Sequence, residues 1–148
     1  MNPKFLFAFV LLVTLSVAHA IRLEKRGTKF TGCADEKVSK QVSTLEITLS
    51  PDPFKPKQNV KFTVSGKTKI DIKDEDGFVF INFFNKKNEE RGFNFIPIPQ
   101  TKAGDSFKVS EEVQVPASKE DMATLTVKVF NYHSDVDKTL LACAKAKY

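Results

Sequence analysis

The stretch from Thr44 to Gly66 decides the fold of this 148-residue chain: T-L-E-I-T-L-S, then P-D-P-F-K-P-K-Q-N, then V-K-F-T-V-S-G. Apolar residues alternate with polar ones in the first segment and again in the third. A period of two is that of a β-strand that buries one face. Prolines cannot donate to a strand ladder, so Pro51, Pro53 and Pro56 keep the connection extended and outside the sheet. The sequence therefore predicts one corner of a β-sandwich.

The remainder of the chain carries six further strand-like segments, separated by turn signals every 8 to 12 residues. They are residues 69–72, 78–84, 93–96, 107–115, 125–132 and 140–148. Helical periodicity is almost absent, and a single helical turn is expected only at residues 116–122. This pattern predicts an all-β fold, an immunoglobulin-like two-sheet antiparallel β-sandwich of about eight strands.

The N-terminus has the pattern of a leader. Residues 1–20 combine a positive start, a short apolar run and an Ala-His-Ala cleavage site, which predicts a signal peptide. The apolar run is too short to cross roughly 30 Å of hydrocarbon, so secretion is favoured over an anchor. Residues 21–26 end in a dibasic pair, which predicts a propeptide, although a charged N-terminus left in place fits the same residues. We expect the protein outside the cell or in the lumen of the secretory–vacuolar pathway.

Residues 27–148 have the length of one domain, 122 residues. The chain has a net charge of +5, with 23 basic and 18 acidic residues. Residues 1–26 hold four of the basic and one of the acidic residues, which leaves 19 against 17, or +2, for the domain. Basic and acidic residues are interspersed along it, whereas a nucleic-acid-binding domain is strongly basic with clustered Lys and Arg. Nucleic acid is therefore not an expected partner.

Two cysteines, Cys33 and Cys143, lie near opposite ends of the domain. In a secretory chain an isolated pair predicts a disulfide. Such a bond would close a loop of about 110 residues and contribute up to ~5 kcal/mol in the chain-entropy model.

The chemistry of an enzyme is missing from the sequence. His133 is the only histidine after the leader, and we expect it in a solvated loop between the last two strands. Nothing in the sequence brings a nucleophile and an acid to it. With both cysteines bonded, no ligand set for zinc remains. We expect no catalytic residues, no metal and no cofactor, which favours a carrier over an enzyme.

The segment F-V-F-I-N-F-F at residues 78–84 carries an unusual apolar load, because only Asn82 in it is polar. Val79, Ile81 and Phe83 are predicted to point inward. Phe78, Phe80 and Phe84 would lie on the opposite side or turn inward at a bulge. Two interpretations stay open: a central strand covered by a loop, or phenylalanines that line a cavity. Eleven Phe and no Trp in residues 27–148 suit an apolar interior of either kind.

Residues 93–99, F-N-F-I-P-I-P, follow as a strand that ends in prolines. Prolines at a sheet edge protect against aggregation, and here they also leave large apolar residues that can form a hydrophobic lip. Both interpretations stay open. Glu111 would point inward by parity with Val109 and Val113, and a bulge at residues 110–112 is expected instead of a buried unpaired carboxylate.

The domain resembles the ML lipid-recognition family, which includes phospholipid- and sterol-transfer proteins. The resemblance rests on Ser50 to Gly66, where the family has Ser-Pro-Asp/Asn-Pro-x-x-Pro-Gly before a strand ending in Ser-Gly. It also rests on the cysteine pair and on Leu141 to Lys145, and it spans Phe30 to Tyr148. Many members carry further cysteines near the position of Ile98 to Gly104, and this chain lacks them.

The resemblance implies an apolar cavity between the two sheets and a lipid carrier without a covalent step. The residues expected to line the cavity are Phe62, Val64, Val79, Ile81, Phe83, Phe95, Phe107, Val109, Val127 and Val129. The residues expected at its entrance are Phe93, Ile96 and Ile98. The expected partners are one phospholipid or sterol and, transiently, membrane surfaces, and the protein is expected to be a monomer. The alternative is a secreted immunoglobulin-like recognition or adhesion module with a solid core.

Overall fold

The computed structural model describes residues 27–118, 120, 122–134 and 137–148. The predicted signal peptide and the 21–26 segment lie outside the described residues. The described chain forms eight strands: β1 (Thr31–Gly32), β2 (Val42–Ser50), β3 (Asn59–Thr68), β4 (Gly77–Phe84), β5 (Glu90–Ile98), β6 (Ser106–Gln114), β7 (Thr124–Ser134) and β8 (Asp137–Lys147). Among these residues, no helix has the length and apolar character that crossing a membrane would need.

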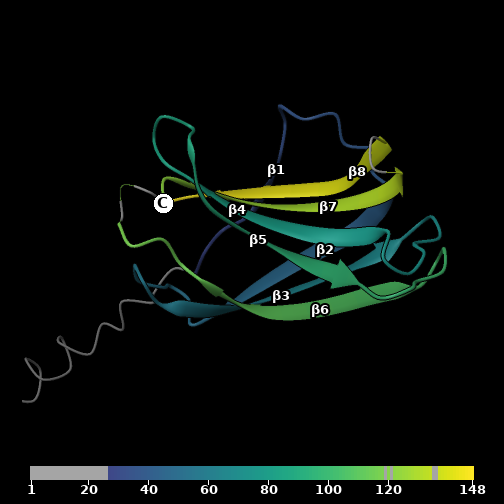
Figure 1. The fold of residues 1–148 in the computed structure, drawn as a ribbon, viewed down its shortest axis with the longest axis horizontal. Helices are drawn as coiled ribbons and strands as arrows, with labels where there is room; N and C mark the ends of the chain where they lie inside the picture. The colour runs from purple at the N-terminus through teal and green to yellow at the C-terminus, as the bar shows by residue number, and fades with distance from the viewer. Residues whose placement is uncertain (1–26, 119, 121, 135–136) are drawn as a thin grey trace, which may run out of the picture.

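The strands form two antiparallel sheets that face each other, so the predicted β-sandwich is confirmed (Figure 1). The larger sheet has the order β1-β8-β7-β4-β5, and the smaller one has the order β2-β3-β6. The two sheets meet along two seams. At one seam the edge strand β2 approaches β8, which lies next to the two-residue edge strand β1, and at the other seam the edge strands β5 and β6 approach each other.

The corner predicted from Thr44 to Gly66 is confirmed as the β2–β3 pair, in which Leu49 lies opposite Phe62. The proline-rich connection lies outside the sheet, and the Ser50–Pro51 and Asp52–Pro53 peptide bonds are cis. Lys57 in this connection has a left-handed backbone, with φ of 61°. That conformation is one that glycine adopts without strain and that residues with a side chain adopt less readily.

The core lies between the sheets and consists of alternate residues of the paired strands. In β3 and β4 every second residue is buried, as the period-two pattern predicts. Val79, Ile81 and Phe83 point inward, so their predicted orientation is confirmed. Burying an aliphatic or aromatic side chain of this size contributes about 1.5–3 kcal/mol, so this interior supplies the main driving force for folding.

Three local predictions are wrong. β3 continues to Thr68, and residues 69–72 are not a strand, although Ile72 makes an isolated bridge to Thr101. Glu111 sits at no bulge, because β6 pairs with β3 in unbroken register; Glu111 stays exposed because β6 is an edge strand. His133 lies within β7 and not in a loop. The helical turn expected at residues 116–122 includes positions 119 and 121, which lie outside the described residues.

The Cys33–Cys143 disulfide is present, with the two Cα atoms 5.5 Å apart. It joins the N-terminal segment to β8, next to the short β1–β8 pairing. A disulfide of this kind is consistent with an oxidising, extracellular-type compartment. The last residue is also tied down: the Tyr148 hydroxyl lies 3.0 Å from Thr28 Oγ1, and Thr28 donates to Asp52 from both its amide and its hydroxyl.

Candidate functional site

The interior between the sheets contains nine of the ten residues predicted to line a cavity. They are buried and belong to one contiguous cluster: Phe62, Val64, Val79, Ile81, Phe83, Phe107, Val109, Val127 and Val129. Phe62 and Phe83 come from opposite sheets and meet edge to face, with ring centroids 6.3 Å apart. These nine residues are therefore buried and pack in one cluster, and their role as the wall of a lipid cavity stays a prediction.

Phe95 does not face the interior, so its predicted place in the cavity wall is wrong. It is 52% exposed and lies opposite Phe80 on the outer face of the larger sheet. The reason is parity along β5: Ile96 and Ile98 point inward, so the alternate residues Phe93, Phe95 and Pro97 point outward. Of the predicted entrance, Phe93 is 62% exposed, whereas Ile96 and Ile98 are part of the buried core.

An apolar pocket of about 440 Å³ opens at the seam between β2 and β8. Its lining includes Val38, Val42, Leu45, Leu141 and Ala142, together with the Cys33–Cys143 disulfide. Val42, Leu141 and Ala142 belong to the core cluster, and Leu45 packs against it. Residues of the buried core therefore form part of the pocket wall, and the size of the pocket is within the range of small-molecule sites. Lys40 supplies a cationic side chain at its lining.

A β-bulge in β2 builds this pocket. The pairing with β3 shifts between Ser43 and Glu46, and Thr44 has a left-handed backbone with φ of 53°. The extra residue lets both Val42 and Leu45 turn toward the interior, although they are three positions apart. The sequence analysis missed this pair. The apolar spacing 42, 45, 47, 49 is the signal that reveals it, because a single step of three interrupts an alternation of two.

The segment that covers the seam, residues 33–41, is fastened by short polar contacts. Asp35 accepts from Lys145 Nζ at 2.7 Å, and Glu36 pairs with Lys128 at the same distance. The hydrogen bond and positive charge of Lys145 lower the pKa of Asp35 below its ordinary value. Ser39 donates to the Leu140 carbonyl from its amide and hydroxyl, both at 2.9 Å. These contacts hold the segment against β8 and, through Lys128, against β7.

The disulfide and Glu36 do not form a metal site. The Glu36 carboxylate lies within 4.8 Å of both sulphur atoms. The two sulphurs are bonded to each other, and Glu36 is engaged by Lys128, so no free ligand set remains there.

Asn131 is one of four buried polar residues among those that the structure describes, and the others are Thr68, Thr101 and Thr126. Asn131 lies on β7 opposite Gly77, is 3% exposed, and its Oδ1 atom has no hydrogen-bond partner among the described residues. Buried acceptors are almost always satisfied, so an unpaired one has to be accounted for. Asn131 offers an acceptor to the hydroxyl or amide of a ligand that reaches this end of the interior.

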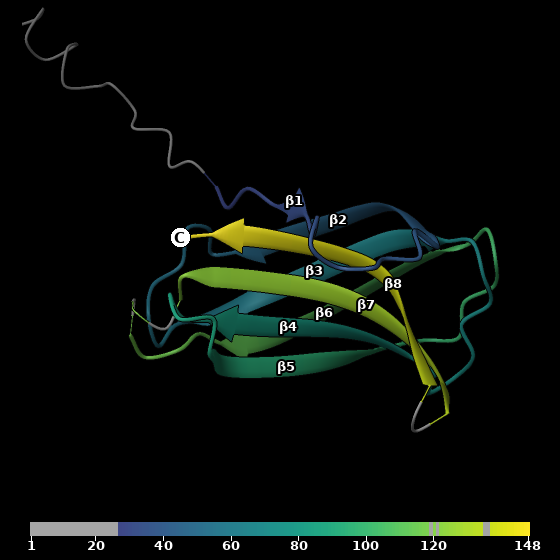
Figure 2. The same ribbon diagram turned by 90° about the horizontal axis from the view of Figure 1, so that it is seen from above.

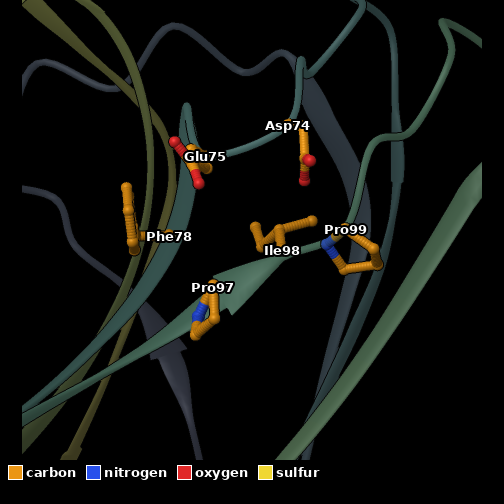
Figure 3. A pocket seen from close by; sticks show the side chains of 6 residues that line it. All are labelled: Asp74, Glu75, Phe78, Pro97, Ile98 and Pro99. Carbon is orange, nitrogen blue, oxygen red and sulfur yellow. The ribbon is translucent and has the colours of Figure 1, made fainter.

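A second pocket, of about 640 Å³, lies where β4 begins and β5 ends (Figure 3). Asp74 and Glu75 stand on the loop before β4, across the pocket from Pro97, Ile98 and Pro99, and Phe78 forms one side. The pocket therefore combines an apolar floor with two carboxylates. It opens beside the outer face of the larger sheet, which carries Phe78.

That outer face carries six aromatic side chains, which we name the aromatic face: Phe78, Phe80, Phe93, Phe95, Phe130 and Tyr132. Ring contacts join five of them: Phe78, Phe80, Phe95, Phe130 and Tyr132. Neighbouring rings contact each other at centroid distances of 5.4 to 6.4 Å, mostly edge to face. Lys138 Nζ lies 5.2 Å from the centroid of Phe130. The sequence anticipated that Phe78 and Phe80 could lie on this side, but not that residues of β5 and β7 would join them.

No protein-family model and no curated protein matches the chain. Among solved structures it is similar to the crystal structure of the C-terminal domain of Wzt, with a TM-score of 0.50 and 13% sequence identity. The similarity covers 86% of this chain and 75% of that domain. At this level of identity it shows the fold alone, and it agrees with the β-sandwich seen here.

Proposed function

We propose that the protein is a secreted lipid-binding and lipid-transfer protein of the ML type. It holds one phospholipid or sterol with the apolar part in the seam pocket and between the sheets, and it exchanges this ligand with membranes. The observation that carries the proposal is the apolar pocket at the β2–β8 seam, whose wall includes residues of the buried core. Its site of action is outside the cell or in the lumen of the secretory–vacuolar pathway.

Transfer from water supplies the affinity. Each methylene group moved from water into an apolar pocket contributes about 0.8 kcal/mol, so even a short stretch of acyl chain is held firmly. Against a bilayer the same methylene groups gain little, so exchange with a membrane is nearly balanced and the ligand can be unloaded. A ligand that penetrates past Leu45 and Val42 has to separate core side chains that pack together in this structure. The two sheets must therefore move apart at the seam when such a ligand enters.

Two polar groups supply the orientation of the ligand. Lys40, at the pocket, suits the polar end of a lipid, and the Asn131 acceptor suits a donor group that enters the interior. An apolar cavity with a few placed polar groups is the usual design of a small-molecule site.

The test is a titration of delipidated, oxidised protein, made from the full-length chain in a secretory host, with fluorescent phospholipids and a fluorescent sterol. We expect saturable one-to-one binding by the wild type. Leu45→Trp fills the seam pocket and is expected to weaken binding at least tenfold. Leu49→Trp is the matched control, because Leu49 is on the same strand and face, is equally half-buried, and does not line the pocket.

Binding that is equal in the two variants, with both folded by circular dichroism, would place the site elsewhere. The second candidate function is a recognition or adhesion module, and the exposed aromatic face favours it. If the folded protein binds no lipid, and organic extraction of freshly purified protein yields none by mass spectrometry, the recognition module becomes the better account.

A further inference from the structure

The aromatic face is an unpartnered surface on an otherwise charged molecule. Phe93 and Phe95 are 62% and 52% exposed, and both stand on β5, the edge strand of the larger sheet. An aromatic side chain offers about 150–250 Å², so these two alone expose roughly 200 Å². The four half-buried rings of the face extend the patch toward about 300–600 Å², the size of the largest apolar patch on a typical monomer, which is often functional.

Charges of opposite sign border the two ends of this face. At one end the loop before β4 carries Asp74, Glu75 and Asp76 against the single Lys73, and Lys138 lies nearby over Phe130. At the other end the β4–β5 turn carries Lys86, Lys87 and Arg91 against Glu89 and Glu90, and Glu120 from outside the turn lines a pocket together with the three basic residues. Both glutamates of the turn are held within the hairpin: Arg91 and Asn85 bind Glu89, and Asn82 binds Glu90. Lys86 and Lys87 project from the turn as exposed residues.

From this arrangement we infer that the aromatic face binds a second copy of this chain and forms a twofold-symmetric dimer. An isologous contact places the same patch on itself, and the direction of the twofold axis decides which ends of the patch meet. With the twofold axis in the plane of the interface and perpendicular to the strands, the acidic end of each protomer faces the basic end of its partner. The axis passes near Phe80, midway along β4.

In this contact the pocket of Figure 3 can accommodate a side chain of the partner protomer. Asp74 and Glu75 lie across from an apolar floor that includes Pro97 and Ile98. A lysine side chain fits that chemistry, because its methylene stem covers apolar surface while its ammonium group reaches the carboxylates. Lys86 or Lys87 of one protomer therefore enters the pocket of the other, and this happens twice in the dimer.

The mode of association is face to face and not edge to edge. β5 is an edge strand, but Pro97 lies within it and Pro99 follows it. Proline on an edge removes a donor and blocks the addition of another strand. The view from above shows β5 at the border of the larger sheet, with the face of β4 and β5 open along its length (Figure 2). The sequence led us to expect a monomer, and this surface leads us to propose a dimer instead.

Two other uses of this face, binding to an anionic membrane and formation of a strong obligate dimer, fit it less well. An anionic membrane needs a basic surface, and this face has an acidic end. A strong obligate dimer needs an interface of at least about 2,000 Å². Here the aromatic groups of both protomers supply roughly 800 Å², and the charged ends bring the total near the ~1,200 Å² lower limit of specific interfaces. The dimer is accordingly weak, with a dissociation constant of roughly 1–100 μM.

The proposal does not depend on lipid binding, because the face lies outside the interior. The experiment is sedimentation velocity of the protein from the full-length chain between 2 and 200 μM (about the range that brackets the expected constant). The wild type is expected to shift from monomer to dimer across this range. Replacing both exposed rings, Phe93→Ser with Phe95→Ser, is expected to weaken the dimer at least 30-fold, as for hot-spot residues (about 2 kcal/mol or more).

Charge reversal gives the decisive test. Lys86→Glu with Lys87→Glu makes both ends of the face acidic, and Asp74→Lys with Glu75→Lys makes both ends basic. Each variant alone is expected to be monomeric, whereas an equimolar mixture is expected to form a heterodimer. All four substituted residues are exposed, so folding is preserved and is checked by urea unfolding. A wild type that stays monomeric at 200 μM, or a mixture that fails to restore dimers, overturns the proposal. Monomers that float with zwitterionic vesicles in a Phe93- and Phe95-dependent way also overturn it and assign the face to membranes.

Discussion

Gly66 ends the strand motif Val-Ser-Gly, and the structure explains why no larger residue stands there. A Cβ atom added at Gly66 would lie 2.7 Å from Val42 Cγ1 and 3.1 Å from Phe107 Cζ. Neither neighbour yields freely, because Val42 is β-branched and stiff at χ1 while Phe107 is buried in the core. The glycine therefore leaves room above β3 for the side chains of Val42 from β2 and Phe107 from β6.

We expect Gly66→Ala to destabilise the fold. Overpacking of this kind costs about 1–3 kcal/mol. Alanine also removes flexibility from the unfolded chain, which offsets about 0.4–1 kcal/mol. The net loss is about 1–2 kcal/mol, and for a domain of this size the melting temperature falls by about 4–8 °C. Because the displaced Val42 lines the seam pocket, lipid binding should weaken as well.

Urea unfolding, with the midpoint and the slope measured separately, tests this reasoning. Gly32→Ala is the matched control, since a Cβ there meets nothing within 4 Å, and its effect should stay within about 0.5 kcal/mol. Adding Val42→Ala removes the closest contact, so the double variant should lose about 0.5–1 kcal/mol less than the sum of the single losses. A Gly66→Ala protein as stable as the wild type, or strict additivity with Val42→Ala, would refute the steric argument.

Two further predictions concern the fastened ends of the chain. Replacing both Cys33 and Cys143 by serine should lower the free energy of unfolding by up to ~5 kcal/mol, because the bond closes a span of 110 residues. Urea unfolding of the wild type with and without reductant measures this loss. Equal unfolding midpoints in the two conditions would contradict the prediction. Burial raises the pKa of Tyr148 to about 12, an effect that the Asp52 charge assists and the Thr28 hydrogen bond opposes. Since the folded pKa lies above the unfolded value near 10, this stabilisation is complete below pH 10 and is lost as pH rises toward 12. After a discount for partial exposure it amounts to about 1 kcal/mol, and Tyr148→Phe should lack that loss when unfolding is followed from pH 9 to 12. Equal pH dependence in Tyr148→Phe and the wild type would contradict the assignment.

The large elements of the fold follow from local patterns in the sequence. Alternation of apolar and polar residues identified β2, β3, β6 and β7, because each strand has one face toward the core. Parity within β4 correctly separated Val79, Ile81 and Phe83 from the phenylalanines on the other side. The disulfide followed from cysteine count and compartment, since only two cysteines remained to pair.

The predictions that failed concern residues whose surroundings depend on strands far away in the sequence. Phe95 looked like an interior residue because it is large and apolar, but its direction is set by the register of β5 against β4. Glu111 looked misplaced because sequence parity does not reveal which strand forms the edge of a sheet. The seam pocket depends on the bulge in β2 and on how close β8 lies, and neither is a local property.

The sequence by itself determined that this protein is a disulfide-bonded β-sandwich with an apolar interior, because periodicity and composition act within a few residues. Only the tertiary structure decided where that interior opens and which phenylalanines lie outside it. The physical reason is that pockets and exposed faces form between strands far apart in the chain. Val42 and Leu141 meet at the seam across nearly 100 residues of sequence, and Phe80, Phe95 and Phe130 join one face only after three strands have paired.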